Sequence, residues 1–484
     1  MAKNIQPVLA HSQPHNDLGW TPVRLAGAPS LAEQLVTHCQ QLLSSHSLRA
    51  GTRMPSVRQL ADSAGISRDT VVQAYDRLVA QGLLTSRPGA GFFVNAQRLP
   101  MGRSSTRQAP TLEPDAAFDT PFLLRSIFRQ YSEVSFDGST GMLPASWLDP
   151  DMLNAAVRSV GRSAGMQLLS YGTPQGYAPL RQQLAAHLMT QGLVIDPELE
   201  LMTVTGVTHG MDLVLRSMLR PGDAVLVEDP AWFLMYGLLR SMGVHVLAVP
   251  RLRDGPDIQV LEQLAHAHQP KLFITNSVVH NPTGFGLSLP VAYDVLRLAE
   301  QHNFLILEDD TYADFVEHPT RLATLDRLRR VILVGGFSKT LAGSLRVGYI
   351  AAQPERIRAL TDAKLLSGLT SPELGERVVH RILAEGQFRK HVQRLRERLD
   401  DTRHRCLRMV ETLGWNVHQE PLAGMFVWVD TGQDTEMLAR KVAAQGILLA
   451  PGVLFSPQQK ISTMLRLPVA IVDESASQQL RKLI

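Results

Sequence analysis

The chain has few of the residues that mark specialised protein classes. Among its 484 residues there are two cysteines, Cys39 and Cys406, too few for a disulfide framework or a cysteine-based metal cluster. No apolar run is long enough to cross a membrane, and residues 1–25 lack the continuous apolar segment of a signal peptide. Internal repeats and low-complexity tracts are also absent. We therefore expect a globular protein in the cytoplasm, without a metal site.

The net charge is small as well, at +3. Its distribution is uneven, because residues 1–100 hold nine Lys or Arg and five Asp or Glu, whereas the rest of the chain holds 39 and 40. The amino-terminal part is therefore +4 and the remainder −1. So modest an excess is also typical of a solvated basic face, and charge alone does not establish nucleic-acid binding. At this length at least two domains are expected.

Three helices and a hairpin are predicted for residues 27–96. Apolar residues recur at helical spacing in the first part of this stretch. Ser56 and Gln59 form a capping-box pattern for a second helix, and Ser67 caps a third. Two short apolar segments within residues 83–94 are typical of a two-stranded wing.

An arginine at the start of the third helix suits the major groove, where the first residues of a recognition helix reach base edges. The stretch resembles the winged helix-turn-helix of GntR-type regulators in the patterns Pro55-Ser56-x-Arg58, Ser67-Arg68-x-Thr70-Val71 and Gly82-x-Leu84. The resemblance implies a double-stranded DNA operator as partner, contacted by Arg58, Ser67, Arg68, Thr70 and Gly89. The wing tip has Ala90 and Phe92 where serine and threonine are usual, which argues against a hydroxyl contact there. A winged helix used only for protein contact is the alternative.

Residues 97–121 are predicted to form a flexible linker, because prolines, serines and a glycine interrupt every helix or strand pattern. A tether of about 20 residues would let two winged helices adopt different separations while their large domains stay paired.

From residue 122 to residue 484, helical stretches alternate with short apolar strands, which are predicted at 224–227, 244–249, 272–275, 304–307 and 331–334. The alternation is typical of an α/β domain, with a mostly parallel sheet covered by helices and a site in the loops at the strand ends. The sequence Gly206-Val207-Thr208-His209 precedes an apolar helix, and its amides can hold an anion, although a glycine before a helix is common.

Lys339 follows Ser338, and Arg346 comes seven residues later. A lysine that forms a Schiff base with an aldehyde cofactor needs small or hydroxylic neighbours and a fixed guanidinium for the cofactor's phosphate. Because apolar residues flank Arg346, we expect its guanidinium to be buried beside an anion. Carboxylates at residues 308–310 end an apolar strand, where a surface acidic cluster is the less favoured interpretation.

These residues, with His280-Asn281-Pro282-Thr283-Gly284 and Asp309-x-x-Tyr312, resemble the site of fold-type I pyridoxal-5'-phosphate (PLP) enzymes, the aspartate aminotransferase family. The resemblance runs from about residue 120 to residue 484. It implies an aminotransferase fold type I domain that binds PLP as an aldimine with Lys339. It assigns Asp309 to the pyridine nitrogen, where an opposite charge shifts a pKa by about 1–3 units.

The same resemblance assigns the other cofactor contacts to Val207, Thr208, Trp232, Asn281, Tyr312, Ser338, Arg346 and, from the partner subunit of a homodimer, Tyr171. It assigns the carboxylate of a substrate or effector to Arg466, since a planar guanidinium binds carboxylates bidentately. Trp232 is equally consistent with core packing. Gly336 stands where serine or threonine is common and His209 where glutamine is frequent, so we expect a phosphate cup with fewer donors.

A GntR-type winged helix joined to an aminotransferase-like domain is the architecture of the MocR subfamily of bacterial regulators, which the chain resembles from about residue 27 to its end. We predict a transcriptional regulator that responds to PLP, to an amino acid or amine, or to both. A catalytically competent aminotransferase tethered to DNA is the alternative, since Lys339, Asp309 and Arg466 are all present. A domain that has lost PLP and only dimerises would require a broken site, which the sequence does not show.

Overall fold

The computed structural model describes residues 18–25, 28–45, 47–95, 136–417, 420–421, 423–443, 445–471, 478 and 480. The chain forms two compact units, divided between Thr111 and Leu112. The linker predicted at 97–121 lies outside the described residues. No helix within the described ranges is long and apolar enough to span a membrane.

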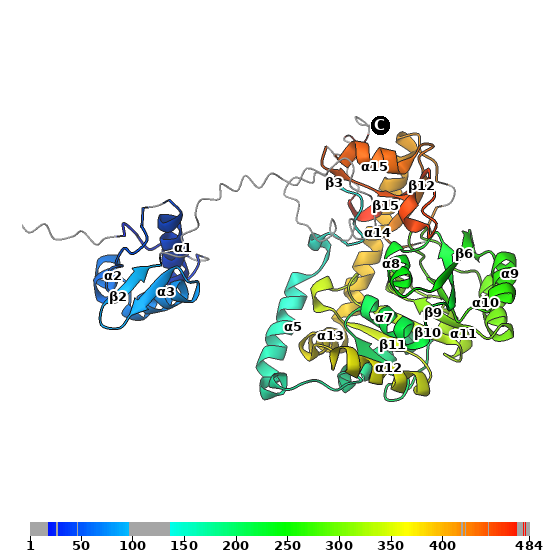
Figure 1. The fold of residues 1–484 in the computed structure, drawn as a ribbon, viewed down its shortest axis with the longest axis horizontal. Coiled ribbons are helices and arrows are strands. Elements are labelled where there is room, and N and C mark those ends of the chain that lie inside the picture. Colours follow the sequence, from blue (N-terminus) through cyan, green and yellow to red (C-terminus); the bar gives the residue numbers. More distant parts are fainter. Residues whose placement is uncertain are drawn as a thin grey trace, which may run out of the picture. The chain divides into compact units, whose positions relative to one another are not determined.

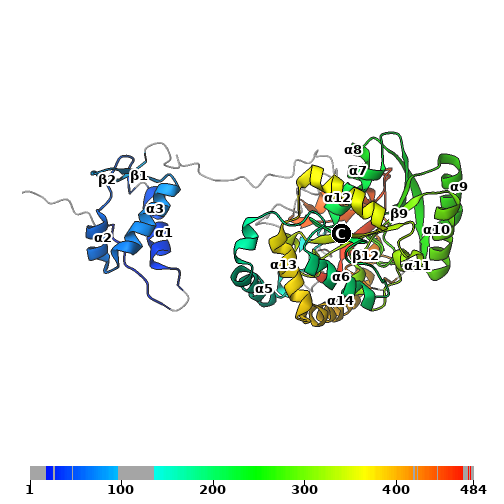
Figure 2. The same ribbon diagram turned by 90° about the horizontal axis from the view of Figure 1, so that it is seen from below.

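The amino-terminal unit packs three helices against a hairpin (Figure 2). Its elements are α1 (Leu31–Ser44), α2 (Val57–Ala64), α3 (Arg68–Ala80), β1 (Leu84–Arg87) and β2 (Gly91–Val94). Both predicted caps form: Ser56 Oγ accepts from Gln59 N at 3.2 Å, and Ser67 Oγ accepts from Thr70 N at 3.1 Å. Each cap satisfies an amide that the first helical turn leaves without a partner. The sharp turn after α2 has Gly65 in the left-handed region, at φ 62°.

The second unit contains an eight-stranded sheet in the order β4-β11-β10-β9-β8-β5-β6-β7. Its strands are β4 (Leu201–Val204), β5 (Ala224–Asp229), β6 (His245–Leu252), β7 (Gly255–Pro256), β8 (Leu272–Thr275), β9 (Leu305–Asp309), β10 (Val331–Gly336) and β11 (Gly348–Ala351). Neighbours from β6 through β10 are parallel, as the alternating pattern predicts. Strand β11 is antiparallel to both of its neighbours, and β7 is antiparallel to β6.

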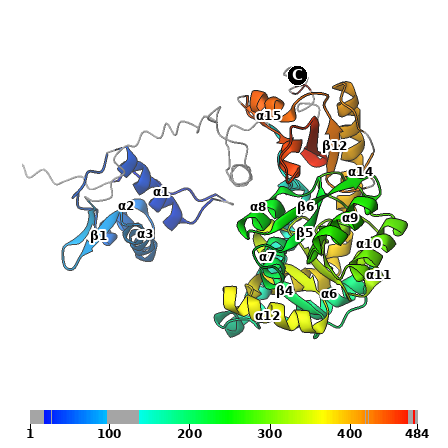
Figure 3. The same ribbon diagram turned by 45° about the vertical axis from the view of Figure 1, so that its right-hand side comes forward.

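Helices cover both faces of this sheet (Figure 3). One face packs against α7 (Val207–Met218), α8 (Phe233–Ser241) and α12 (Pro354–Gly368). The other packs against α5 (Pro150–Ser163), α6 (Ala178–Thr190), α9 (Ile258–His268), α10 (Leu289–Gln301), α11 (Leu322–Asp326) and α13 (Glu373–Ala384). Successive strand residues alternate between the two cores, as Ile306 and Leu307 do on β9. This is the doubly wound arrangement that places a site at the strand ends.

A smaller sheet, in the order β12-β15-β14, completes the second unit. Its strands are β12 (Phe426–Asp430), β14 (Ala450–Pro451) and β15 (Met464–Pro468). The long helix α14 (Gln387–Thr412) and the helix α15 (Thr435–Ala443) pack with this sheet in one hydrophobic core (Figure 1). A two-stranded pair of β3 (Phe136–Asp137) with β13 (Ile447–Leu448) leads into the loop that follows residue 137.

Candidate functional site

The carboxyl ends of the parallel strands bring the candidate side chains together. Trp232 follows β5 and precedes α8, Asn281 follows β8, Asp309 is the last residue of β9, and Lys339 follows β10. Parallel neighbouring strands end at one edge of a sheet, so residues far apart in sequence meet there.

Lys339 is half-buried, and its Nζ donates to the carbonyl oxygen of Gly141 at 2.7 Å. Burial, reinforced by the Arg466 guanidinium and opposed by Asp309, lowers the pKa of this amine to about 8. An amine with this pKa is a better nucleophile near neutral pH than an ordinary lysine.

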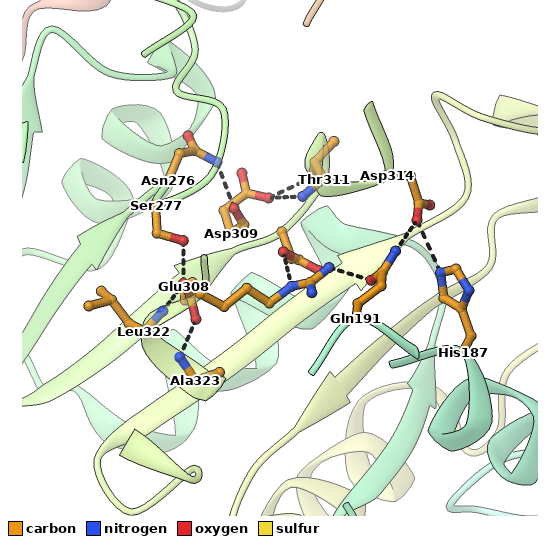
Figure 4. Close-up of polar contacts among 12 residues, drawn as sticks. His187, Gln191, Asn276, Ser277, Glu308, Asp309, Thr311, Asp314, Leu322 and Ala323 are labelled. Carbon is orange, nitrogen blue, oxygen red and sulfur yellow. Dashed lines mark hydrogen bonds and ion pairs between the residues drawn. The ribbon is translucent and has the colours of Figure 1, made fainter. Parts of the chain in front are cut away.

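Asp309 lines a small cavity together with Trp232 and Met211, on the face covered by α7 and α8. Its Oδ1 accepts from Thr311 N at 3.0 Å and from Thr311 Oγ1 at 2.5 Å, while Asn276 Nδ2 donates to its backbone oxygen at 2.9 Å (Figure 4). Burial raises the pKa of the Asp309 carboxyl, and the bonds from Thr311 counteract that shift. A cationic ring nitrogen in this cavity would favour the ionised form.

Both neighbours of Asp309 point to the opposite face of the sheet and are held there. Glu308 accepts from Ser277 Oγ and from the amides of Leu322 and Ala323 at 2.7 and 2.8 Å (Figure 4). Burial raises the pKa of Glu308 to about 7.

Asp310, the other neighbour, pairs with Arg321, whose Nε lies 2.7 Å from Asp310 Oδ1. The two flanking carboxylates therefore fix the end of β9, and of these three neighbouring carboxylates only Asp309 lines the cavity beside Trp232. Beyond Arg321, Gln191 donates to Asp314, which also pairs with His187 at 3.0 Å (Figure 4).

Arg466 connects the site to the smaller sheet. It lies on β15, is 2% exposed, and donates through Nη1 to Asn281 Oδ1 at 3.2 Å. Asn281 in turn donates to Tyr312 Oη at 3.2 Å, so these three predicted contacts lie side by side. Burial raises the pKa of the Tyr312 phenol.

The Arg466 guanidinium has no carboxylate partner in the part of the chain that the structure describes, and its Nε is buried without an acceptor. It also donates to Ser139 O at 2.6 Å and Thr140 O at 3.3 Å, and it lies over the rings of Phe426 and Phe455, at 4.3 and 5.1 Å. Burial lowers the pKa of Arg466 to about 10. A buried cation with a free donor fits an incoming carboxylate.

The start of α7 forms the candidate phosphate cup. Gly206 caps this helix at φ 78° and gives no side-chain hydrogen bond to the first amides, those of Val207 and Thr208. Arg346 Nη2 donates to Thr205 O at 3.2 Å, and a Cβ on Gly206 would lie 2.7 Å from that nitrogen. The cradle fits an anion such as a phosphate at a helix start.

The expected burial of Arg346 is wrong, because its side chain is exposed. Its backbone is left-handed, at φ 52°, after the short helix η4 (Gly343–Leu345), and this turn directs the guanidinium away from the apolar side chains on either side. Ser338 is half-buried beside Lys339. A Cβ on Gly336 would lie 3.1 Å from Val207 Cγ2, so close packing accounts for the missing hydroxyl there.

Tyr171 is 81% exposed in the single chain, in the loop between η2 (Gly165–Leu169) and α6. Its contact with a partner subunit remains a prediction. Trp232 is half-buried: it packs against the α7 and α8 core and also lines the Asp309 cavity, while its contact with a pyridine ring remains a prediction.

Some residues of the site escaped sequence reasoning. The loop at Ser139 and Gly141 supplies backbone acceptors to Arg466 and Lys339, and Asn276 and Thr311 support Asp309. The glycine-flanked sequence from Gly138 to Gly141 was the available indication of a close backbone approach.

On the amino-terminal unit, Ser67, Arg68 and Thr70 lie together at the start of α3. Arg58 is exposed on α2, 3.9 Å from Asp62, and Gly89 has φ 73° at the wing tip. Their DNA contacts remain predictions.

Two families match the chain: "Aminotransferase class I and II" over residues 142–484, and "Bacterial regulatory proteins, gntR family" over residues 31–94. The "Uncharacterized HTH-type transcriptional regulator YdcR" of Escherichia coli is 27% identical, over 93% of this chain and 98% of that protein. The 2-aminoadipate transaminase of Thermus thermophilus is 32% identical, over 71% of this chain and 88% of that enzyme.

Among solved structures, LysN, an α-aminoadipate aminotransferase of T. thermophilus complexed with N-(5'-phosphopyridoxyl)-L-leucine, is similar with a TM-score of 0.68. It is 28% identical, and the similarity covers 75% of this chain and 93% of that chain. Pyridoxal 5'-phosphate is thus the cofactor of the second unit. The chain belongs to the aminotransferase class I and II family and, with a GntR module preceding that domain, has the architecture of the MocR subfamily of regulators.

Proposed function

We propose that the protein is a transcriptional regulator in the cytoplasm that binds an operator through its winged helix and senses PLP, together with an amino acid or amine, through its aminotransferase-like domain. The observation that supports this proposal is that one chain carries both sets of candidate groups. The start of α3 presents Ser67, Arg68 and Thr70, while the second unit holds Lys339 and Asp309 in one site.

PLP, when bound, supplies an aldehyde and an electron-withdrawing ring. In our proposal Lys339 attaches to the aldehyde and Asp309 faces the ring nitrogen. Asn281 and Tyr312 would donate hydrogen bonds to the phenolic oxygen, and Trp232 would stack on the pyridine ring. Phosphate would be held by the remaining predicted contacts, which are Val207, Thr208, Ser338, Arg346 and the partner's Tyr171.

Arg466 would bind the carboxylate of an effector. Its buried guanidinium lacks a carboxylate among the described residues, and its bond to Asn281 links effector binding to the cofactor contacts. A carboxylate that pairs with Arg466 would satisfy the free Nε donor.

We also propose a homodimer, with domains at 27–96 and 122–484 joined by a tether at 97–121. Large apolar side chains are exposed around the start of α13: Met166, Leu169, Leu366, Leu369 and Leu374. Exposed apolar groups of this size are typical of an interaction surface. The η2 segment lies beside α13, because Arg377 Nη2 donates to Gln167 Oε1 at 2.8 Å.

Absorption spectroscopy combined with operator binding tests the proposal. The purified full-length protein is titrated with PLP and then with amino acids, and the visible band and operator affinity are followed in parallel. We expect a band from PLP attached to Lys339 and a change in operator affinity on loading. Absence of the band in the wild-type protein would refute the cofactor assignment, and an operator affinity indifferent to PLP would refute the sensing role.

A tethered aminotransferase is the second candidate, favoured by the presence of Lys339, Asp309 and Arg466 in one site and by the similarity to an aminotransferase. Multiple-turnover conversion of an amino acid and a keto acid would favour it.

A further inference from the structure

The loop that carries Tyr171 is anchored to the first turn of α13. Thr173 Oγ1 donates to Gly176 O at 2.6 Å and Gly176 N donates to Thr173 O at 2.9 Å, so the segment after Tyr171 is a closed turn. Glu376 Oε2 then accepts from Tyr177 N at 2.8 Å. The turn is therefore fixed at the end where it enters α6.

Glu376 is 2% exposed, and its carboxylate makes a second bond, at 2.5 Å, to Thr203 Oγ1 on β4. The backbone carbonyl oxygen of Thr203 is also hydrogen-bonded, because it accepts from Lys364 Nζ at 2.9 Å. A Cβ on Gly176 would overlap Thr203 Oγ1, at 1.8 Å, which shows how closely the turn lies on β4. One buried carboxylate thus joins the Tyr171 loop, the sheet and α13.

The other end of the turn lies close to the same helix. A Cβ on Gly172, the residue after Tyr171, would lie 2.8 Å from Glu373 Oε2. Glu373 is fixed by Arg377, whose Nη2 lies 2.6 Å away, and the Arg377 guanidinium lies 4.4 Å from the centre of the Tyr177 ring. Both ends of the turn therefore contact α13, although the Tyr171 ring itself is exposed.

The first turn of α13 also packs against the element that carries Arg346. A Cβ on Gly375 would lie 2.7 Å from Leu345 O, directly before Arg346. The first turn of α13 thus contacts two segments of the same chain: the segment that carries Arg346 and the loop that carries Tyr171.

We propose that Glu376 is a positioning residue that acts on the site of the partner subunit, by holding Tyr171 in the conformation that completes the partner's phosphate cup. This inference rests on the proposed function, in which Tyr171 contacts PLP across a homodimer. An ordered loop loses less conformational entropy on docking than a free one, so its side chain binds more tightly. Loss of Glu376 would also leave Thr203 and the Tyr177 amide without an acceptor.

Mixed dimers of the full-length protein test the direction of this effect. Two differently tagged chains are co-expressed, and one of them carries Lys339→Ala, so that PLP attaches only to the other chain. Glu376→Ala is placed on either chain, and the PLP affinity of the one functional site is measured by visible absorption. Glu376→Ala on the Lys339→Ala chain should weaken this affinity about tenfold, whereas on the Lys339-bearing chain it should change it less than about twofold.

A structural defect alone would not produce this asymmetry. Glu385→Ala, which removes an exposed partner of Arg381 at the end of α13, is the matched control and should leave both arrangements unchanged. Glu376→Gln keeps one acceptor and should give a smaller loss in the same arrangement, so it replaces Glu376→Ala if that chain does not fold.

Tyr171→Ala is also placed on either chain of the mixed dimer. It separates the contact of Tyr171 across the dimer from the role of Glu376 in positioning it. If Tyr171→Ala weakens PLP binding only from the Lys339→Ala chain and Glu376→Ala has no effect there, the role of Glu376 is refuted while the proposed dimer site stands. If Tyr171→Ala acts only on its own chain or not at all, the contact across the dimer fails, and the role of Glu376 fails with it.

Discussion

At the scale of single residues, Lys339 and Lys364 of the second unit have amines of similar acidity and different surroundings. Burial lowers the pKa of both Lys339 and Lys364 to about 8. Lys364 is 1% exposed and donates to Thr203 O, whereas Lys339 is half-buried at the edge of the site beside Asp309. Access to the cofactor, rather than acidity, therefore distinguishes them.

We expect PLP fixed by borohydride reduction to label Lys339 and not Lys364. Peptide mass mapping of the reduced full-length protein would locate the label. Lys339→Ala should abolish it, and Lys364→Met should retain it, because the latter removes an amine of similar acidity outside the site. Label at Lys364 in the wild-type protein would contradict the assignment of Lys339.

The lowered pKa of Lys339 also predicts a pH dependence. Only the unprotonated amine attacks an aldehyde, so the attachment rate should rise about tenfold per pH unit below pH 8 and level off above it. Stopped-flow absorption from pH 6 to 9.5 would record this profile. Because the Arg466 cation contributes to the lowering, Arg466→Met should move the midpoint to higher pH. A wild-type midpoint near that of a free lysine, about 10.4, would contradict the burial argument.

Residue chemistry was largely predictable from sequence, whereas side-chain direction was not. Asp309, Tyr312, Lys339 and Arg346, which their spacing singled out, lie near one another at the strand ends, and their roles toward a cofactor remain predictions. The left-handed backbone at Arg346 depends on the packing of the turn before it, so apolar neighbours did not ensure burial. The carbonyl of Gly141 was missed because any residue type can supply a backbone acceptor.

At the scale of elements, the start of α3 is the predicted reading surface. Arg68 is the first helical residue and is exposed, while Arg77 lies in the last turn of the same helix, 3.8 Å from Glu33. In a helix-turn-helix the amino-terminal residues of the recognition helix contact base edges.

Arg68→Ala should therefore weaken operator binding by about 1–3 kcal/mol and relax specificity if Arg68 contacts guanine. Fluorescence anisotropy with operator and scrambled duplexes, at fixed salt, separates the two effects. Arg77→Ala is the matched control on the same helix and should leave the operator preference unchanged. An equal loss on both duplexes in Arg68→Ala would show a phosphate contact instead.

Some helices and strands could be predicted from the sequence and others could not. Helix caps at Ser56 and Ser67 were predictable because a cap depends on residues three positions apart. The parallel strands followed from the alternating pattern, but β4 and β11 did not, since both lie outside the run of parallel strands and pair antiparallel. Antiparallel pairing between segments far apart in the sequence is not marked by the alternation of helices and strands.

At the scale of the whole molecule, regulation requires that a ligand in the second unit change how the winged helices meet DNA. A ligand shifts this equilibrium only if it binds one arrangement of the dimer more tightly than another. A tether at residues 97–121 would give the winged helices room to follow such a change, and contact between Tyr171 and the partner's site would make the dimer arrangement sensitive to PLP.

We therefore expect PLP, with or without an amino acid or amine, to change operator affinity or footprint, while transamination turns over slowly or not at all. Footprinting of the full-length protein with and without PLP, on an operator with two half-sites, would measure the change. Lys339→Ala is the control, since it keeps the DNA-binding residues but loses the covalent link, and its footprint should not respond to PLP in the same way. Turnover at ordinary aminotransferase rates, combined with a footprint indifferent to PLP and ligand, would instead identify an enzyme whose winged helix only tethers it to DNA.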